Sequence, residues 1–312
     1  MEHRPHPHDR DDEDRLDLAA AKLGLGRYRA FRPPSALVEV EFGAATDPGR
    51  RRATSDDHYW IMRIGRNQET IKSSLPDGCV PDRFEEHAYG MVVADGMGPD
   101  GPEIASRHAI ATLAQLLLHF GKWNVRVNER TLWEIVQRAE RFYQKVGDEV
   151  TDASRRHPGL AGMSTTLTAA YSAGDELVVV HVGHSRAYLY RGGLLTRLTR
   201  DQTLAQRIAE TGRTTPIELA AHDLRHRLTD AIGGQNGTPD IEIQNYQLID
   251  GDVVMLSTNG LTDLVDDDQI ANVLRNGERL GLDAQCQRLV DLALERGGPD
   301  NITALLARYK IP

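Results

Sequence analysis

The stretch Tyr89–Gly98, YGMVVADGMG, carries the most informative pattern in the chain. Met91, Val92 and Val93 are consecutive apolar residues, which is typical of a strand buried on both faces. Asp95-Gly96 follows at once, and a glycine there would let the backbone turn sharply and present its carbonyl to an ion. Polar residues flank three other predicted strands in the same way: Asp56-Asp57 before Tyr59–Ile64, Asn259-Gly260 after Val253–Ser257, and Asp300-Asn301 before Ile302–Leu306.

These strand-end residues suggest a metal site, because clustered oxygen ligands suit hard divalent cations such as Mg²⁺ and Mn²⁺. His and Cys pairs with zinc spacing are absent from the sequence. A single Asp-Gly at a strand end is more often an ordinary turn. The turn reading and the metal reading therefore both stay open at this point.

The remaining periodicity predicts strands and helices on either side of this stretch. Apolar residues recur at three- and four-residue spacing over 110–120 and 132–150, which indicates two long amphipathic helices. Short β-favouring runs separated by turn residues predict antiparallel strands. These strands are expected at Ala36–Phe42 with Tyr59–Ile64 as its neighbour, and at Thr165–Tyr171, Leu177–Val182 and Ala187–Tyr190. One late helix is expected at Ala284–Glu295, before Gly297-Gly298-Pro299.

Together these elements predict an α+β fold, a sandwich of two antiparallel sheets flanked by helices. Residues 1–36 are expected to form an N-terminal tail, and residues 37–312 the domain. Within the domain, residues 67–87 read as a variable surface insertion, and residues 199–240 as a mobile, flap-like lobe over the core.

Composition limits the classes of partner and compartment. The net charge is −9, from 37 Lys and Arg against 46 Asp and Glu, which argues against nucleic acid or an anionic membrane as a partner. Two cysteines, no long apolar run and a charged, His-rich start predict a cytoplasmic protein. His3, His6 and His8 could bind a metal, but a solvated tail is the favoured reading.

In collinear order over residues 37–310, the chain resembles the type 2C serine/threonine protein phosphatases in their bacterial form. The similar segments are Thr46–Asp57 (TDPGRRRATSDD), Val93–Gly98 (VADGMG), Gly162–Thr166 (GMSTT), Val182–Leu189 (VGHSRAYL), Leu198–Gln202 (LTRDQ), Ser257–Asp263 (STNGLTD) and Asp300–Thr303 (DNIT). The fold that this resemblance implies agrees with the sandwich predicted above.

The resemblance also implies a function, the hydrolysis of phosphoserine and phosphothreonine in proteins by water that two Mn²⁺ or Mg²⁺ ions activate. It implies that Asp95 bridges both ions, that the Gly96 carbonyl and Asp300 each bind one ion, and that Asp56 and Asp57 hold metal-bound waters. Arg52 would bind the phosphate, although Arg50-Arg51-Arg52 could also be a solvated basic turn. Arg52, Asp57 and Asp95 are thus the expected catalytic residues.

Two positions depart from the family pattern, because His184 and Asn259 stand where the family has Asp. Asn259 would still offer an oxygen to the ion that Asp95 and Asp300 bind, but with one negative charge fewer. His184 could be a softer ligand that suits Mn²⁺, or a hydrogen-bonded surface histidine, and a third metal site is in doubt. His181, in an apolar strand, is expected to be a satisfied core histidine.

Two functions follow from these departures. The chain is either a weakened phosphatase, whose partners would be phosphoproteins and a serine/threonine kinase pathway, or a pseudophosphatase that binds phosphoproteins or a kinase. An ordinary ligand-binding sandwich is a third and weaker alternative.

Overall fold

The computed structural model describes residues 37–75, 79–99, 101–121, 129–212, 223–234 and 237–312. The predicted tail, residues 1–36 with His3, His6 and His8, lies outside these ranges. All strand pairing that the structure records is antiparallel, as the sequence predicted.

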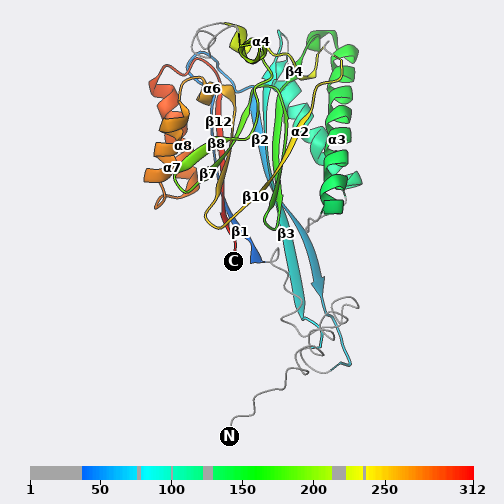
Figure 1. Cartoon of the computed structure of the whole chain (residues 1–312). Helices are drawn as coiled ribbons and strands as arrows, with labels where there is room; N and C mark the ends of the chain where they lie inside the picture. The colour runs from blue at the N-terminus through cyan, green and yellow to red at the C-terminus, as the bar shows by residue number, and fades with distance from the viewer. Residues whose placement is uncertain (1–36, 76–78, 100, 122–128, 213–222, 235–236) are drawn as a thin grey trace.

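The strands form two sheets (Figure 1). The first sheet has the order β1 (Glu39–Asp47), β12 (Ile302–Lys310), β11 (Val253–Ser257), β7 (Arg186–Arg191) and β8 (Leu194–Arg197). The second sheet has the order β10 (Glu242–Gln247), β6 (Glu176–Val182), β5 (Leu167–Ala173), β3 (Arg83–Met97), β4 (Ser164–Thr165) and β9 (Ile232–Gly233), and β2 (Asp57–Glu69) also pairs with β3.

Helices cover the outer face of each sheet. In Figure 1, α2 (Pro102–Phe120) and α3 (Glu129–Arg156) lie on one side of the sandwich, and α7 (Asp267–Asn276) and α8 (Leu282–Glu295) on the other. The apolar side chains accordingly form three main layers, one between the sheets and one under each helix pair. The predicted fold class is therefore confirmed. No helix in the described ranges is long and apolar enough to cross a bilayer.

Alternation within a strand decides which layer receives each side chain. On β12, Leu305 and Ala307 pack between the sheets with Met91 and Val93, whereas Leu306 faces α8. Since successive side chains of a strand point to opposite faces, β12 is apolar on both, as a strand in the middle of a layered sandwich requires.

The helix α7 was missed by the sequence analysis, which expected one late helix. Its start is fixed by a capping box, in which Asp266 Oδ1 accepts from the Gln269 amide at 2.9 Å and Gln269 Oε1 accepts from the Asp266 amide at 3.2 Å. The apolar periodicity of α7 is weak in the sequence, because the helix begins with an acidic run, Asp266–Asp268, and buries only Ile270, Ala271 and Leu274.

One expectation about strand neighbours was wrong. β1 pairs with β12 in the first sheet, not with the strand at Tyr59–Ile64, which belongs to β2 in the second sheet. Within the proposed insertion at 67–87, residues 67–69 and 83–87 continue the β2–β3 ladder, which ends at Glu69↔Arg83. The two strands project from the body as a long ribbon (Figure 1).

Some residues of the lobe predicted at 199–240 belong to the sandwich. It contains the short helix α4 (Leu204–Glu210) and the 3₁₀ turn η4 (Asp223–His226). Its later residues form β9, which pairs with β4, and Ile232 is fully buried beneath α3. Residues 213–222 and 235–236 lie outside the described ranges.

The layer between the sheets should carry much of the stability. Leu305→Ala removes a side chain with 0% exposure, so we expect a loss of about 2–5 kcal/mol in the free energy of unfolding in a urea titration. The matched control is Leu194→Ala, because Leu194 is 74% exposed and its loss should cost less than about 0.5 kcal/mol. Equal losses for the two variants would contradict the layer assignment.

Candidate metal centre and reaction cavity

Asp57 and Asp95 face each other across the β2–β3 ladder. Asp57 Oδ2 accepts hydrogen bonds from Thr258 Oγ1 at 2.7 Å, directly after β11, and from Thr303 Oγ1 of β12 at 2.8 Å. Its other oxygen, Oδ1, is buried and has no hydrogen-bond partner. A buried carboxylate oxygen without a donor is costly unless something else satisfies it. Asp57 therefore presents a free ligand atom next to Asp95.

Burial is the main influence on the protonation of this pair. The pKa of Asp57 is raised to about 7 by burial and, to a lesser extent, by the charges of Asp300 and Asp56, against the hydrogen bonds from Thr258 and Thr303. Burial also raises the pKa of Asp95 well above its usual value, helped by Asp57 and Asp300. An added positive charge would reverse both shifts, because it favours the ionised form.

Arg52 contacts two other acids at this site, Asp56 and Asp300. Its Nη1 donates to Asp56 Oδ2, and its Nε lies 3.1 Å from Asp300 Oδ1. Arg52 thus bridges two of the predicted ligands, while its side chain stays 44% exposed beside the turn at 49–51, so the phosphate-binding reading and the solvated-turn reading both stay open. The neighbouring Arg50 does something different, since it binds the Leu294 and Gly298 carbonyls at the end of α8.

Asn301 fixes the loop that carries Arg52 and Asp56. Its Oδ1 accepts from the Asp56 amide at 2.8 Å, and its Nδ2 donates to the carbonyls of Pro48 at 2.9 Å and Thr54 at 3.2 Å. Ser106 of α2 adds a contact from the other side, because its hydroxyl donates to the Asp56 carbonyl at 2.6 Å. The acidic loop is therefore held by both layers of the sandwich.

Gly96 is required by close approach, not by a turn. The sequence analysis expected the backbone to turn here, but β3 continues through Gly96 to Met97. A Cβ at Gly96 would lie 1.9 Å from the Pro102 carbonyl oxygen, and one at Gly260 would lie 1.9 Å from that of Asn301. Glycine therefore lets the start of α2 lie against β3 at Gly96, and lets the residue before β12 lie against α6 at Gly260.

His184 is not the hydrogen-bonded surface residue that one reading of the sequence favoured. It is 7% exposed, and its Nδ1 is buried without a partner. Burial lowers the pKa of His184 to about 4, and the nearby His226 contributes to this shift. The imidazole is therefore neutral at physiological pH and could accept or donate one further bond.

Asn259 begins the single-turn helix α6 (Asn259–Thr262). Its Nδ2 donates to Asp263 Oδ2 at 3.3 Å, and the same carboxylate oxygen lies 3.5 Å from His226 Nδ1 in η4. Sequence analysis assigned no role to Asp263 or His226. The four-residue spacing from Asn259 to Asp263 on a helical turn could have indicated the first contact, but no local pattern indicates the second.

Most of the predicted site residues line one cavity of about 480 Å³, which we call the reaction cavity. Six predicted residues line it: Arg52, Asp95, Gly96, His184, Asn259 and Asp300. Asp56 and Asp57 lie directly behind this wall, through the contacts of Arg52 and the pairing with Asp95. Arg51, Arg225, His226 and Asp263 line it without having been predicted.

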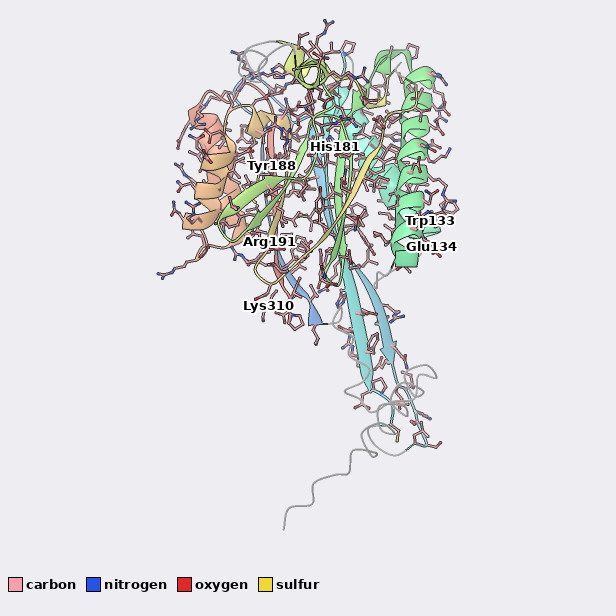
Figure 2. All side chains as sticks on the ribbon, in the orientation of Figure 1. Trp133, Glu134, His181, Tyr188, Arg191 and Lys310 are labelled. Atoms are coloured by element: carbon pink, nitrogen blue, oxygen red, sulfur yellow. The ribbon has the colours of Figure 1, made fainter. Side chains whose placement is uncertain are left out.

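His181 confirms its expected structural role. Its Nδ1 pairs with Thr168 Oγ1 at 2.8 Å and its Nε2 with the Arg200 carbonyl at 3.1 Å. Figure 2 shows it among the strands, toward the end of the sandwich that carries α4 and α6. Arg191 and Lys310 mark the opposite end (Figure 2).

The donor set fits a hard divalent cation. It offers carboxylate, amide and backbone oxygens, an orphaned Asp57 oxygen, and two acids whose pKa values are raised first by burial and then by neighbouring acids. The described residues contain no ready-made cluster of three or more His, Cys, Asp or Glu side chains around one point. Two of the acids, Asp56 and Asp300, form ion pairs with Arg52 instead of converging on one point with the other acids.

Comparison with known proteins agrees with this geometry. Residues 76–292 match the family described as protein phosphatase 2C. The serine/threonine protein phosphatase PstP of Mycobacterium tuberculosis is 34% identical over 235 residues, which cover 74% of this chain and 43% of PstP. The chain therefore spans less than half the length of that relative.

Solved structures show the same likeness over most of the chain. The serine/threonine phosphatase of S. agalactiae has a TM-score of 0.71 and 27% identity, covering 86% of this chain and 99% of that one. The catalytic domain of PstP in complex with two manganese ions has a TM-score of 0.64 and 29% identity, covering 88% of this chain and 99% of that one. The family match and the identity to PstP show that the chain belongs to the protein phosphatase 2C family, and the fold agrees with this assignment.

Proposed function

We propose that this chain hydrolyses phosphoserine and phosphothreonine residues of proteins at a centre of two divalent metal ions. The observation that carries the proposal is the pairing of Asp95, which lines a cavity that also contains Arg52, with the buried Asp57 behind it, whose Oδ1 has no hydrogen-bond partner. Relatives named as serine/threonine phosphatases and the two manganese ions in the PstP structure support it.

Asp95, the Gly96 carbonyl, Asn259 and Asp300 would hold the ions directly, and Asp56 and Asp57 would hold their waters. When bound, the ions lower the pKa of water and neutralise charge on the phosphoryl oxygens. The chain's own contribution is position: Thr258 and Thr303 orient Asp57, and Asn301 orients Asp56. His184, if it binds a metal, would favour Mn²⁺ over Mg²⁺, and the neutral Asn259 would weaken the binding of either ion.

Arg52 is the residue that we expect to bind the substrate phosphate. A guanidinium presents a planar fork of donors that matches phosphate oxygens. In the described structure this fork engages Asp56 and Asp300, so phosphate would replace carboxylates as its partner.

The replacement of acids by His184 and Asn259 supports a second candidate, a pseudophosphatase that binds phosphoproteins or a kinase. Both residues line the cavity, so the charge that they fail to supply is missing at the site itself. A phosphoprotein partner is common to both candidates. A kinase pathway, the absence of nucleic-acid and membrane partners, and a cytoplasmic location stay predictions.

The first prediction for the site concerns the stability of the fold without metal. The pKa of Asp57 is about 7 in the folded chain against 3.8 as the ordinary value, so its favourable protonated state is fully present below about pH 4. That stability is lost as pH rises to about 7. In EDTA, Asp57→Asn should therefore gain thermal stability relative to wild type between about pH 4 and 7.

The control for this comparison is Asp268→Asn, which changes an exposed acid in the first turn of α7. We expect its melting temperature to follow the wild-type dependence on pH. Parallel profiles for wild type and Asp57→Asn would show that Asp57 is not strained by burial.

The second prediction tests the metal centre and the activity together. Mn²⁺ at about 100 times its dissociation constant should stabilise the fold by about 2.7 kcal/mol, or roughly 5 °C in melting temperature. It should also support phosphate release from p-nitrophenyl phosphate and a phosphothreonine peptide. Asp95→Asn should lose both effects, whereas Asp268→Asn should keep both.

The two readouts separate the candidates. A melting shift with no phosphate release above that of Asp95→Asn would favour the pseudophosphatase. No melting shift at any Mn²⁺ concentration would exclude the metal centre.

The third prediction concerns the missing charge at position 259. Asn259→Asp restores an anionic ligand, so the Mn²⁺ concentration for half-maximal activity should fall by about five- to tenfold. Asn259→Ala, which removes the oxygen altogether, should raise it. If Asp and Ala moved it equally, position 259 would not contact the ion.

A further inference from the structure

A second cavity adjoins the reaction cavity and has no part in the chemistry proposed above. Its volume is about 460 Å³, and it shares four wall residues with the reaction cavity: His184, Arg225, Asn259 and Asp263. The rest of its wall comes from β7, β8 and α4 and includes Arg186, Arg197, Asp201 and Gln206. We refer to it as the side cavity. A group bound there would lie beside a phosphate held at Arg52.

Most of the charge on one wall of the side cavity is already paired. Arg186 binds Asp201 through two hydrogen bonds, Nε to Oδ1 at 2.9 Å and Nη2 to Oδ2 at 2.7 Å. Arg197 reaches the same carboxylate only through one contact, Nη1 to Oδ2 at 3.5 Å, and its side chain is 32% exposed. Since Asp201 balances Arg186, Arg197 retains most of its capacity to bind an anion.

Arg225 on the opposite wall also has donors to spare. Its Nε donates to His226 Nε2 at 2.9 Å, which makes Nδ1 the protonated nitrogen of His226 and directs it toward Asp263 at 3.5 Å. Among the described residues, the terminal nitrogens of Arg225 have no hydrogen-bond or ion-pair partner. The side cavity therefore sets three guanidinium groups against two carboxylates, although the whole chain has a net charge of −9.

We propose that the side cavity binds an acidic side chain of the substrate, close in sequence to the phosphorylated residue, through Arg197 and Arg225. This inference rests on the proposed function for the position of the phosphate. Carboxylate and phosphate are the anions that a guanidinium fork fits, so an Asp, a Glu or a second phosphorylated residue would serve. The side cavity thereby selects among phosphoproteins that present the same phosphothreonine.

The test is a series of phosphothreonine peptides with a single Glu at each position from three residues before to three residues after the phosphothreonine. Each Glu peptide is paired with a Gln peptide of the same shape, and kcat/KM is measured with Mn²⁺. We expect one position at which Glu is preferred over Gln by about tenfold, equivalent to about 1.4 kcal/mol. Phosphoserine at that position distinguishes a preference for phosphate from one for carboxylate.

The variants Arg197→Gln and Arg225→Gln should reduce the Glu/Gln ratio to about threefold or less. Arg288→Gln, an equal loss of charge on the exposed face of α8, should leave both the ratio and the activity unchanged. Equal rates for Glu and Gln at every position, or a ratio that persists in both variants, would overturn the inference.

Binding separates this inference from the proposed function. Labelled versions of the same peptides are titrated into the full chain, and the dissociation constant is measured by fluorescence anisotropy. A preference for Glu that depends on Arg197 and Arg225, without turnover, would uphold the side cavity and refute the phosphatase. Turnover without any Glu preference would do the reverse, and the absence of any binding or turnover would refute the inference as well.

Discussion

One carboxylate joins the two sheets at the end of the sandwich where the reaction cavity lies. Asp57 belongs to the second sheet by its pairing with Asp95, yet its Oδ2 accepts hydrogen bonds from Thr303 of β12 in the first sheet and from Thr258, which directly follows β11. The two threonines also bond to each other, because the Thr303 amide donates to Thr258 Oγ1 at 3.0 Å. The distance between the sheets therefore sets where the free oxygen of Asp57 points, and the packing between the sheets becomes part of the site.

This arrangement makes the ionised forms of two neighbouring acids costly. Asp57 is buried beside Asp95 on the adjacent strand, and the raised pKa values of both show that their ionised forms are disfavoured. Arg52 offsets only part of the negative charge, since it binds Asp56 and Asp300 at the rim. A cation in the cavity would stabilise the ionised forms of Asp57 and Asp95 and so lower the free-energy cost of burying them. A site can bind an ion for this reason even when its ligands do not converge on one point beforehand.

The sequence was sufficient for the layers and the acidic loops, because both depend on local patterns: periodicity for the strands and helices, and collinear motifs for Arg52, Asp95 and Asp300. It failed where the decisive contact is distant in the chain. No local signal shows that β1 pairs with β12, or that His226 reaches Asp263 from another segment. It also misjudged Gly96, where the reason for glycine is the Pro102 carbonyl and not a turn.

The two departures from the family motifs take on a second meaning in this light. His184 and Asn259 stand in the wall that the reaction cavity shares with the side cavity. Asn259 also begins a chain of contacts through Asp263 and His226 to Arg225. An aspartate at position 259 would face Asp263 with like charge, whereas the amide donates to it. In the proposed metal centre, the neutral Asn259 would supply less charge to the ion, while its amide leaves Asp263 in contact with His226, which in turn contacts Arg225. The proposed metal affinity and the arrangement of the basic wall would then both depend on Asn259.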